Sequence, residues 1–356
     1  MFSVIQAKKI LFENVRKQSE KIKSVSEVSG YVSAKNIKSP VDLPLFDQSA
    51  MDGFAVNFEP EKLLKGKNFF KICGEIKAGD KPYGRLKKNN AVYIYTGAEV
   101  PVNTACVVMQ EKTVVENGKV VIHKEALIKG SNIRSKGSQI KKGELALKKG
   151  FLMNPGAIGF LSSMGISKIK VTGKPSVSVL STGNELQRSG LRSSPGKIYD
   201  SNSIMLKAVI NDNGFEAKQV NSVRDDRKKL SKYISGMLSA SDVLIITGGI
   251  SVGKYDLVKE ILESCGVKEL FYKVSQKPGK PMYAGKLKEK IIFALPGNPA
   301  ASLVCFYEYI LPALRKMSCY SDYDLKKEHI PLSESYEVKG NRDLFLKAKI
   351  SDGKVT

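Results

Sequence analysis

Three apolar segments in the second half of the chain constrain its fold most strongly. They span residues 176–180, 242–246 and 291–295, and each is largely apolar before a loop that carries glycine. A helical pattern follows each loop. Apolar strands that alternate with helices are typical of a doubly wound parallel sheet with helices on both faces. The sequence therefore predicts a three-layer, doubly wound α/β domain over residues 174–317.

The loops after these segments are the expected ligand site, because a doubly wound sheet binds ligands outside the carboxyl ends of its strands. The loop over residues 247–253 carries three glycines and two hydroxyl side chains before a helix. Such a loop suits a phosphate or another oxyanion, since backbone N–H groups can surround the anion. It matches neither the Walker pattern nor the GxGxxG fingerprint.

The rest of the chain predicts further domains, since 356 residues exceed one ordinary hydrophobic core. Residues 44–142 hold short alternating runs and the turn dipeptide Asn117-Gly118, which together predict a β-rich module with a tight hairpin. Residues 1–43 and 143–173 predict one discontinuous, mixed α+β linking domain around that module. Residues 318–356 predict a short C-terminal β domain that is incomplete.

The composition excludes several classes of protein. With 42% hydrophobic and 26% charged residues, the chain is typical of a globular protein, and it shows neither an apolar run of membrane-spanning length nor a signal peptide. We therefore expect a cytoplasmic protein with no membrane partner. Five scattered cysteines and two histidines argue against a zinc cluster or a disulfide framework. Any metal is expected to be a hard cation held by carboxylates and phosphate oxygens.

The formal net charge of +23 raises the question of a nucleic-acid partner. The lysines are spread along the chain singly or in pairs, without a dense basic tract or interleaved aromatic residues. Solvated lysine faces explain this distribution better than a nucleic-acid groove, so we expect no nucleic-acid partner. The positive field would still attract a small anionic substrate.

The loop over residues 42–56 is especially rich in residues that favour specific turn geometries. Gly53 permits a tight turn, and Asp47, Ser49 and Asp52 can each bond to neighbouring backbone. The residue types alone leave two interpretations open. The loop either is a solvated turn that leads into a strand, or it holds a ligand.

Acidic residues at the expected strand ends each admit two roles. Glu185 can hold Mg²⁺ or orient water, or it can lie in a first helical turn, where the helix dipole favours an acid. Asp225 and Asp226 lie at a strand-to-helix junction and suit helix caps. Asp256 begins a helix, and its position is equally compatible with a cap and with a ligand-binding residue.

Two further loops carry more polar groups than their backbone needs. Two prolines and a glycine hold Lys273, Lys277 and Lys280 in an irregular loop. Rigid presentation of cations suits an anionic ligand, with a merely solvated loop as the alternative. Asp200 and Asn202 belong to a group of short polar side chains at a helix start, and this group exceeds what a single cap requires.

Six short motifs occur in order along nearly the whole chain, at residues 47–55, 95–98, 181–186, 247–253, 277–281 and 295–299. Each motif alone is weak. Together they closely resemble the molybdopterin molybdenumtransferase family, which includes MoeA and the gephyrin E domain. The resemblance implies an elongated four-domain subunit that works as a homodimer, dimerising through the discontinuous domain. The α/β domain of one subunit would face the β module of the other.

The resemblance also implies the reaction. Adenylylated molybdopterin is hydrolysed with release of AMP while molybdate is placed on the dithiolene sulfurs, giving molybdenum cofactor, with Mg²⁺ as the usual divalent cation. Molybdopterin adenylyltransferase and molybdoenzyme maturation proteins are the further partners that this reaction suggests. Two alternatives stay open at this point: a cofactor-binding scaffold of the same fold with weak catalysis, and a molybdopterin adenylyltransferase, which shares the α/β domain alone.

The resemblance assigns roles to particular residues. Asp52 would face the molybdate or phosphate site across the dimer, with Thr96 nearby. Glu185, Asp225 and Asp256 would bind the cation or orient the ligand, and with Asp52 they form the expected catalytic set. The expected cofactor-binding residues are Thr96, Ser181, Thr182, Gly183, Asp200, Asn202, Thr247, Gly248, Gly249, Ser251, Gly253, Lys273, Lys277, Lys280, Pro296 and Pro299.

Two features depart from the family pattern. Gln139 stands where the family commonly has an acid after an Asn-Ile-Arg sequence, so this amide carries no charge for a cation. A different cation geometry or slower turnover is expected if that acid normally binds the cation. The sequence also stops at Thr356, where the last β domain of the family normally continues.

Overall fold

The computed structural model describes residues 1–250, 257–338 and 340–356. Its contacts divide the chain into two compact units. The α/β unit comprises Met1–Lys35, Lys149–Asn154 and Ile169–Thr356, and the β unit comprises Asn36–Lys148 and Pro155–Lys168. The finer division into four domains stays a prediction.

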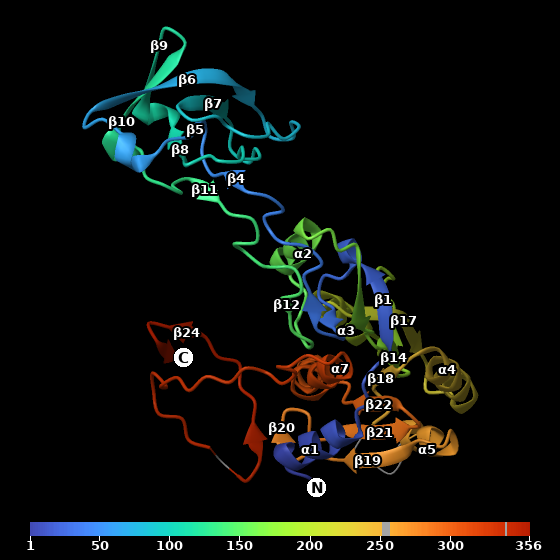
Figure 1. Ribbon diagram of the computed structural model, residues 1–356. Coiled ribbons are helices and arrows are strands. Elements are labelled where there is room, and N and C mark those ends of the chain that lie inside the picture. Colours follow the sequence, from blue (N-terminus) through green and yellow to red (C-terminus); the bar gives the residue numbers. More distant parts are fainter. Residues whose placement is uncertain (251–256, 339) are drawn as a thin grey trace. The chain divides into compact units, whose positions relative to one another are not determined.

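A six-stranded mixed sheet forms the centre of the α/β unit (Figure 1). Its strand order is β17-β14-β18-β22-β21-β19. The strands are β14 (Ser176–Thr182), β17 (Glu216–Val223), β18 (Val243–Thr247), β19 (Lys268–Tyr272), β21 (Tyr283–Leu287) and β22 (Lys290–Leu295).

The expectation of an all-parallel sheet is wrong at one strand. The first four strands pair in parallel, whereas β21 runs antiparallel to both of its neighbours. Only Lys288 and Glu289 separate β21 from β22, and Lys288 has a φ of +54°. So short a connection permits only an antiparallel pair, because a parallel crossover needs a dozen or more residues.

Helices cover both faces of this sheet and complete three layers. Alternate strand residues belong to different cores, with Ile245 in one cluster and Ile246 in the other. The first core contains residues of α1 (Val4–Asn14), α3 (Asn202–Asp212), α6 (Pro299–Cys305) and α7 (Leu311–Met317). The second contains residues of α4 (Arg227–Ala240) and α5 (Leu257–Ser264).

Smaller elements surround the layers of the α/β unit. β1 (Glu20–Ser24), β13 (Lys168–Thr172) and β2 (Val32–Ser33) form a three-stranded sheet, and β15 (Leu186–Gln187) pairs with β16 (Ile198–Tyr199). A π-helical turn, Phe306–Ile310, joins α6 to α7. Near the C-terminus, β23 (Asp343–Leu344) pairs in parallel with β20 (Gln276–Lys277), and β24 (Ile350–Ser351) pairs with β25 (Lys354–Val355).

The β unit is built on a second six-stranded sheet, of order β8-β5-β7-β6-β10-β9. Its strands are β5 (Gly53–Val56), β6 (Lys67–Ile76), β7 (Asn90–Ile94), β8 (Cys106–Met109), β9 (Thr113–Glu116) and β10 (Lys119–His123). The predicted hairpin is confirmed, since Glu116 pairs with Lys119 across Asn117 and Gly118. Both turn residues have a positive φ, as a two-residue hairpin loop requires.

Short pairs and one helix complete the β unit. β4 (Gln48–Ser49) pairs with β11 (Ile133–Arg134), β3 (Ile37–Lys38) pairs with β12 (Leu145–Leu147), and α2 spans Pro155–Ser163. None of the helices in the described ranges is long and apolar enough to span a membrane.

Candidate functional site

The strand ends of the α/β unit bring the predicted loops to one edge. The register pairs Ser181 of β14 with Thr247 of β18, and Thr247 with Leu295 of β22. The three loops after these strands therefore leave the sheet together, as predicted. β19 runs in the same direction as β22, because β21 is antiparallel to both. The lysine loop, residues 273–282, consequently starts at this edge as well.

A buried carboxylate joins two of these strands to a helix. Asp200 is 5% exposed, and its Oδ1 accepts hydrogen bonds from Ser181 Oγ at 3.0 Å and from the backbone N–H of Ser203 at 3.1 Å. Its Oδ2 accepts one from Ser203 Oγ at 2.7 Å. Ser181 Oγ also lies 3.0 Å from Thr247 Oγ1, which acts as the donor because Ser181 has only one hydroxyl hydrogen. This network fixes the start of α3 against the ends of β14 and β18.

Two exposed carboxylates flank the end of β14. Asp225 Oδ1 accepts a hydrogen bond from Thr182 Oγ1 at 2.6 Å. The carboxylate of Glu185 occupies the space beside Gly183, where an added Cβ would lie 2.6 Å from Oε1. Asp225 therefore borders the last residue of β14, and Glu185 borders the residue that follows it.

The structure separates the two neighbouring acids at the next strand-to-helix junction. Asp226 is the N-cap of α4 and accepts a hydrogen bond from the backbone N–H of Lys229 at 2.8 Å. Asp225 faces Thr182 instead. One acid thus caps the helix, and the other contributes to the edge where the loops meet.

The loop after β18 packs tightly against the end of β14. An added Cβ on Gly248, whose φ is +81°, would lie 2.0 Å from the carbonyl oxygen of Thr182. At Gly249, whose φ is +65°, it would lie 2.5 Å from Val258 Cγ2. Only glycine fits both the backbone angle and the space. Three predicted residues lie outside the described ranges: Ser251, Gly253 and Asp256.

The loop after β22 is held by α3 and begins α6. Asn202 Nδ2 donates a hydrogen bond to the carbonyl oxygen of Gly297 at 2.8 Å. Asn298 caps α6 by accepting from its first free N–H groups at 2.9 and 3.3 Å, and Pro299 follows at the first helical position. Asn202 Oδ1 is buried and has no hydrogen-bond partner among the described residues. A ligand N–H group would satisfy such an acceptor.

The lysine loop presents its cations on a constrained backbone. Lys273 has a φ of +63°, which is uncommon for a residue with a side chain, and its Nζ lies 4.8 Å from the centre of the Tyr272 ring. The carbonyl oxygen of Lys280 accepts hydrogen bonds from two N–H groups of the loop at 3.0 and 2.9 Å. No carboxylate of the described residues forms an ion pair with Lys273, Lys277 or Lys280. Their charges are therefore left for an anionic ligand.

A buried amide, which the sequence did not single out, anchors this loop to the helical layer. Gln276 is fully buried, and its Oε1 accepts a hydrogen bond from the hydroxyl of Tyr309 in the π-helical turn. Its Nε2 donates to the carbonyl oxygen of Pro278 at 3.0 Å and lies 3.7 Å from Cys305 Sγ. Burial raises the pKa of Cys305 to about 12 and raises the pKa of Tyr309, so both stay neutral near pH 7.

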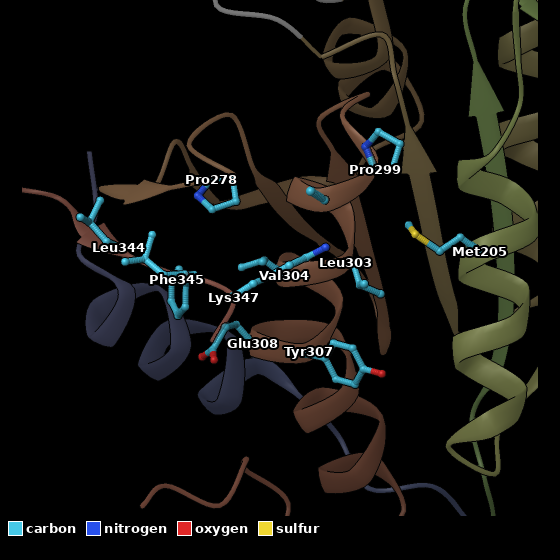
Figure 2. A pocket seen from close by; sticks show the side chains of 12 residues that line it. Met205, Pro278, Pro299, Leu303, Val304, Tyr307, Glu308, Leu344, Phe345 and Lys347 are labelled. Carbon is cyan, nitrogen blue, oxygen red and sulfur yellow. The ribbon is translucent and has the colours of Figure 1, made fainter. Parts of the chain in front are cut away.

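An apolar cavity of about 750 Å³ lies beside the loops that contain Pro278 and Pro299 (Figure 2). Leu303 and Val304 of α6 and Tyr307 of the π-helical turn line one side of it, and Phe345 lines it from the segment after β23. Few polar groups reach this cavity. Its lining suits a flat or apolar part of a ligand whose charged part lies at the lysine loop.

The β unit carries its own candidate group in the loop before β5. Asp52 Oδ1 accepts hydrogen bonds from the backbone N–H of Thr96 at 2.7 Å and from its Oγ1 at 2.8 Å. The N–H bond and then the hydroxyl bond hold the pKa of Asp52 below its ordinary value. Gly53 is required next to it, since an added Cβ would lie 1.9 Å from the carbonyl oxygen of Val108. The exposed Asp52 carboxylate is thus charged and held in one place.

Comparisons with known proteins agree on one family. Residues 2–165 match the family described as “MoeA N-terminal region (domain I and II)”, and residues 178–316 match “Probable molybdopterin binding domain”. The molybdopterin molybdenumtransferase of Staphylococcus epidermidis is 34% identical over 318 residues, which cover 86% of this chain and 76% of that protein. The chain belongs to the MoeA family. Its predicted identity as a molybdopterin molybdenumtransferase, an enzyme of molybdenum cofactor synthesis, is confirmed.

Two further MoeA-family proteins give the same result. The molybdopterin molybdenumtransferase of a Nostoc species is 35% identical over 326 residues, covering 89% of this chain and 74% of that protein. The solved structure of the molybdopterin biosynthesis MoeA protein from Pyrococcus horikoshii is 31% identical, with a TM-score of 0.79. That likeness covers 100% of this chain and 89% of the solved chain.

Most of the predicted MoeA-family site residues lie at or next to the strand-end edge of the α/β unit. Asp52 and Thr96 contact each other in the β unit. No feature of the sequence pointed to Gln276 or Tyr309, because a glutamine beside lysines and prolines gives no sign that it will be buried. The residues at the edge are Ser181, Thr182, Gly183, Glu185, Asp200, Asn202, Asp225, Thr247, Gly248, Gly249, Lys273, Lys277, Lys280, Pro296 and Pro299.

Proposed function

We propose that this MoeA-family enzyme performs molybdenum insertion at the strand-end edge of the α/β unit. Adenylylated molybdopterin would be hydrolysed there with release of AMP, while molybdate is placed on the dithiolene sulfurs. The observation that carries the proposal is the arrangement around the ends of β14 and β19. Two carboxylates flank Thr182 and Gly183, and the loop that starts from the same edge carries three lysines that form no ion pair with any described carboxylate.

The residues at this edge suit the charges of that substrate. The lysine ammonium groups would bind the phosphate oxygens and the molybdate oxyanion, because neither the lysine loop nor its described neighbours neutralise them. Oδ1 of Asn202, which meets no hydrogen-bond donor within the described ranges, would accept an N–H group of the substrate. Hydrolysis adds water across one P–O bond of the adenylyl linkage, and the two phosphates leave as monoesters. Fixed ammonium groups favour this step, since negative charge on phosphate oxygens grows as the bond breaks.

Mg²⁺ is the cation that the carboxylates would hold. The described residues contain no cluster of three metal-ligating side chains. Mg²⁺ commonly uses one or two carboxylates and takes its remaining ligands from water and substrate phosphates, so Glu185 and Asp225 fit it beside a bound phosphate. When bound, the cation would neutralise phosphate charge. We propose Asp256 as a further ligand on the basis of its place in the family motif.

We propose further that Asp52 acts on the same substrate from the partner subunit of a homodimer. The support is the family resemblance together with the local geometry, since Thr96 holds the Asp52 carboxylate ionised and exposed. A fixed carboxylate facing the substrate can orient water or a cation-bound group.

Product analysis tests the reaction. Purified protein incubated with adenylylated molybdopterin, molybdate and Mg²⁺ should release AMP in step with the formation of molybdenum cofactor. An absence of AMP, with an active homologue run in parallel, contradicts the proposal. Consumption of ATP with free molybdopterin would instead identify an adenylyltransferase.

Mixing two inactive variants tests the composite site. Asp52→Ala and Asp225→Ala change groups that we place on opposite sides of one site. If each site combines two subunits, mixed dimers of the two variants contain one intact site and should regain about a quarter to a half of the wild-type activity after subunit exchange. No recovery in dimers shown to be mixed contradicts a shared site but leaves the reaction itself unaffected.

A further inference from the structure

A second cavity of the α/β unit, of about 480 Å³, lies where the strands of the main sheet begin. Lys174 and Ser176 line it at the start of β14, and Glu216 and Lys218 line it at the start of β17. The candidate catalytic edge lies at the other ends of these strands. A strand of seven residues spans roughly 20 Å, so the two places are distinct.

Four lysines gather around this cavity: Lys21, Lys23, Lys174 and Lys218. Within the described ranges, none of the four forms an ion pair with a carboxylate. Glu216 is the acidic residue of the lining, and it is exposed. The cavity therefore has an excess of positive charge that the surrounding residues do not balance.

Lys174 is held in a defined position inside this group. Its Nζ donates a hydrogen bond to the carbonyl oxygen of Gly214 at 2.7 Å and lies 4.5 Å from the centre of the Tyr31 ring. An added Cβ on Gly30 would lie 3.2 Å from this ammonium group, and one on Gly214 would lie 3.6 Å from it. Two glycines from different loops thus leave the space that the ammonium group fills.

The charge of Lys174 is poorly compensated where it lies. Burial, and then the nearby charge of Lys23, lower the pKa of Lys174 below its ordinary value. An ammonium group has three N–H donors, and one of them is used by Gly214. A half-buried cation with spare donors gains strongly from an anion that supplies both charge and hydrogen-bond acceptors.

We propose that the cavity lined by Lys21, Lys23, Lys174 and Lys218 is a binding site for a small multivalent oxyanion, such as a phosphate or diphosphate group. Lys174 forms its fixed donor at the floor. The Nζ of Lys23 lies 5.2 Å from the centre of the same Tyr31 ring. Lys23 and the more exposed Lys21 and Lys218 supply the remaining charge. A purely structural role, in which Lys174 only supports Gly214 and Tyr31, predicts no such affinity.

Calorimetric titration with sodium diphosphate at constant ionic strength tests the site. The lysine loop also binds anions in our proposal, so wild-type protein should show two binding events. Lys174→Met keeps the length of the side chain but removes its charge, and it should weaken one event about tenfold or more. Lys277→Met should weaken the other event. Lys207→Met, which changes an exposed lysine of α3 that belongs neither to the lining of this cavity nor to the lysine loop, serves as the matched control.

Two further variants keep the test decisive if Lys174→Met folds poorly. Lys23→Met should weaken the same event, and Glu216→Gln should strengthen it, because it removes the negative charge of the lining. Molybdenum insertion should be unchanged in Lys23→Met, since the cavity lies away from the catalytic edge. If Lys277→Met abolishes all binding of diphosphate, the proposed site does not exist. The same conclusion follows if neither Lys174→Met nor Lys23→Met weakens any binding event.

Discussion

Asp200 and Asp52 accept hydrogen bonds of the same kinds in opposite surroundings. Asp200 is buried in the α/β unit and receives two hydroxyls and one backbone N–H. Asp52 is exposed in the β unit and receives both of its bonds from Thr96. When a buried acceptor is removed, its donors are left without any hydrogen-bond partner, because water cannot reach them. When an exposed acceptor is removed, its donors form hydrogen bonds to water instead. Asp200 is thus tied to folding, and Asp52 is free to serve a ligand.

Replacing the exposed acid should have the largest effect on activity. Asp52→Ala should lower molybdenum insertion by about two orders of magnitude or more, the usual size of the loss of a well-placed polar group in a site. Its melting temperature should stay close to that of the wild type, because the carboxylate packs against little. AMP release and thermal unfolding measure the two quantities. Glu116→Ala, an exposed acid of β9 in the same unit, is the control, and an equally large fall in the melting temperature of Asp52→Ala would favour a structural role.

Replacing the buried acid should show the reverse pattern. Asp200→Ala leaves Ser181 Oγ and both donors of Ser203 without their acceptor, so the free energy of unfolding should fall by about 3 kcal/mol. Urea denaturation measures this loss. Ser201→Ala, at an exposed neighbouring residue whose side chain does not cap α3, should change stability by less than about 0.5 kcal/mol. A loss of activity in Asp200→Ala without a loss of stability would break the contrast with Asp52.

Loss of the Tyr309–Gln276 hydrogen bond, which anchors the lysine loop, should lower both activity and stability, each by less than the two replacements above. Tyr309→Phe removes the hydroxyl that donates to Gln276 and should cost about 1 to 2 kcal/mol of stability. Because the loop then loses its fixed position, KM for adenylylated molybdopterin should rise more than kcat falls. Tyr233→Phe is the control, since Tyr233 is exposed on α4 and its hydroxyl makes no hydrogen bond within the described residues. An unchanged KM in Tyr309→Phe would limit the anchor to a folding role.

The smallest effect is expected in the titration of Asp52. Hydrogen bonds favour its ionised form, so their stabilising contribution is present above its ordinary pKa and is lost as the pH falls through the lowered pKa. Thr96→Val removes the hydroxyl donor but keeps the backbone N–H, so the pKa should rise only part of the way towards its ordinary value. Carbon-13 NMR between about pH 2 and 6 follows this carboxylate. Thr104→Val, whose hydroxyl bonds elsewhere, should leave the pKa of Asp52 unchanged.

The sequence was sufficient to predict the strand-end edge of the α/β unit, because the periodicity of apolar residues and the residue types of turns are local properties. Apolar strands followed by glycine-bearing loops led to the α/β layers and to the position of the ligand loops. The turn residues Asn117 and Gly118 identified a hairpin. The reversal of β21 was missed, since the pattern of an apolar strand is the same in either direction and only the short turn at Lys288 distinguishes the two. Likewise, the adjacent acids Asp225 and Asp226 look equivalent until the helix start decides which one is the cap.

The sequence by itself determined the family, the order of the motifs and the residue types of the candidate site, because these depend on what each segment contains. The tertiary structure decided which polar groups are buried and which partners they meet. Asp200 and Gln276 carry no local sign of burial, since their donors come from β14 and from the π-helical turn. Burial depends on the segments that fold over a residue, and for this reason the roles of Asp200, Gln276 and the four clustered lysines emerge only in three dimensions.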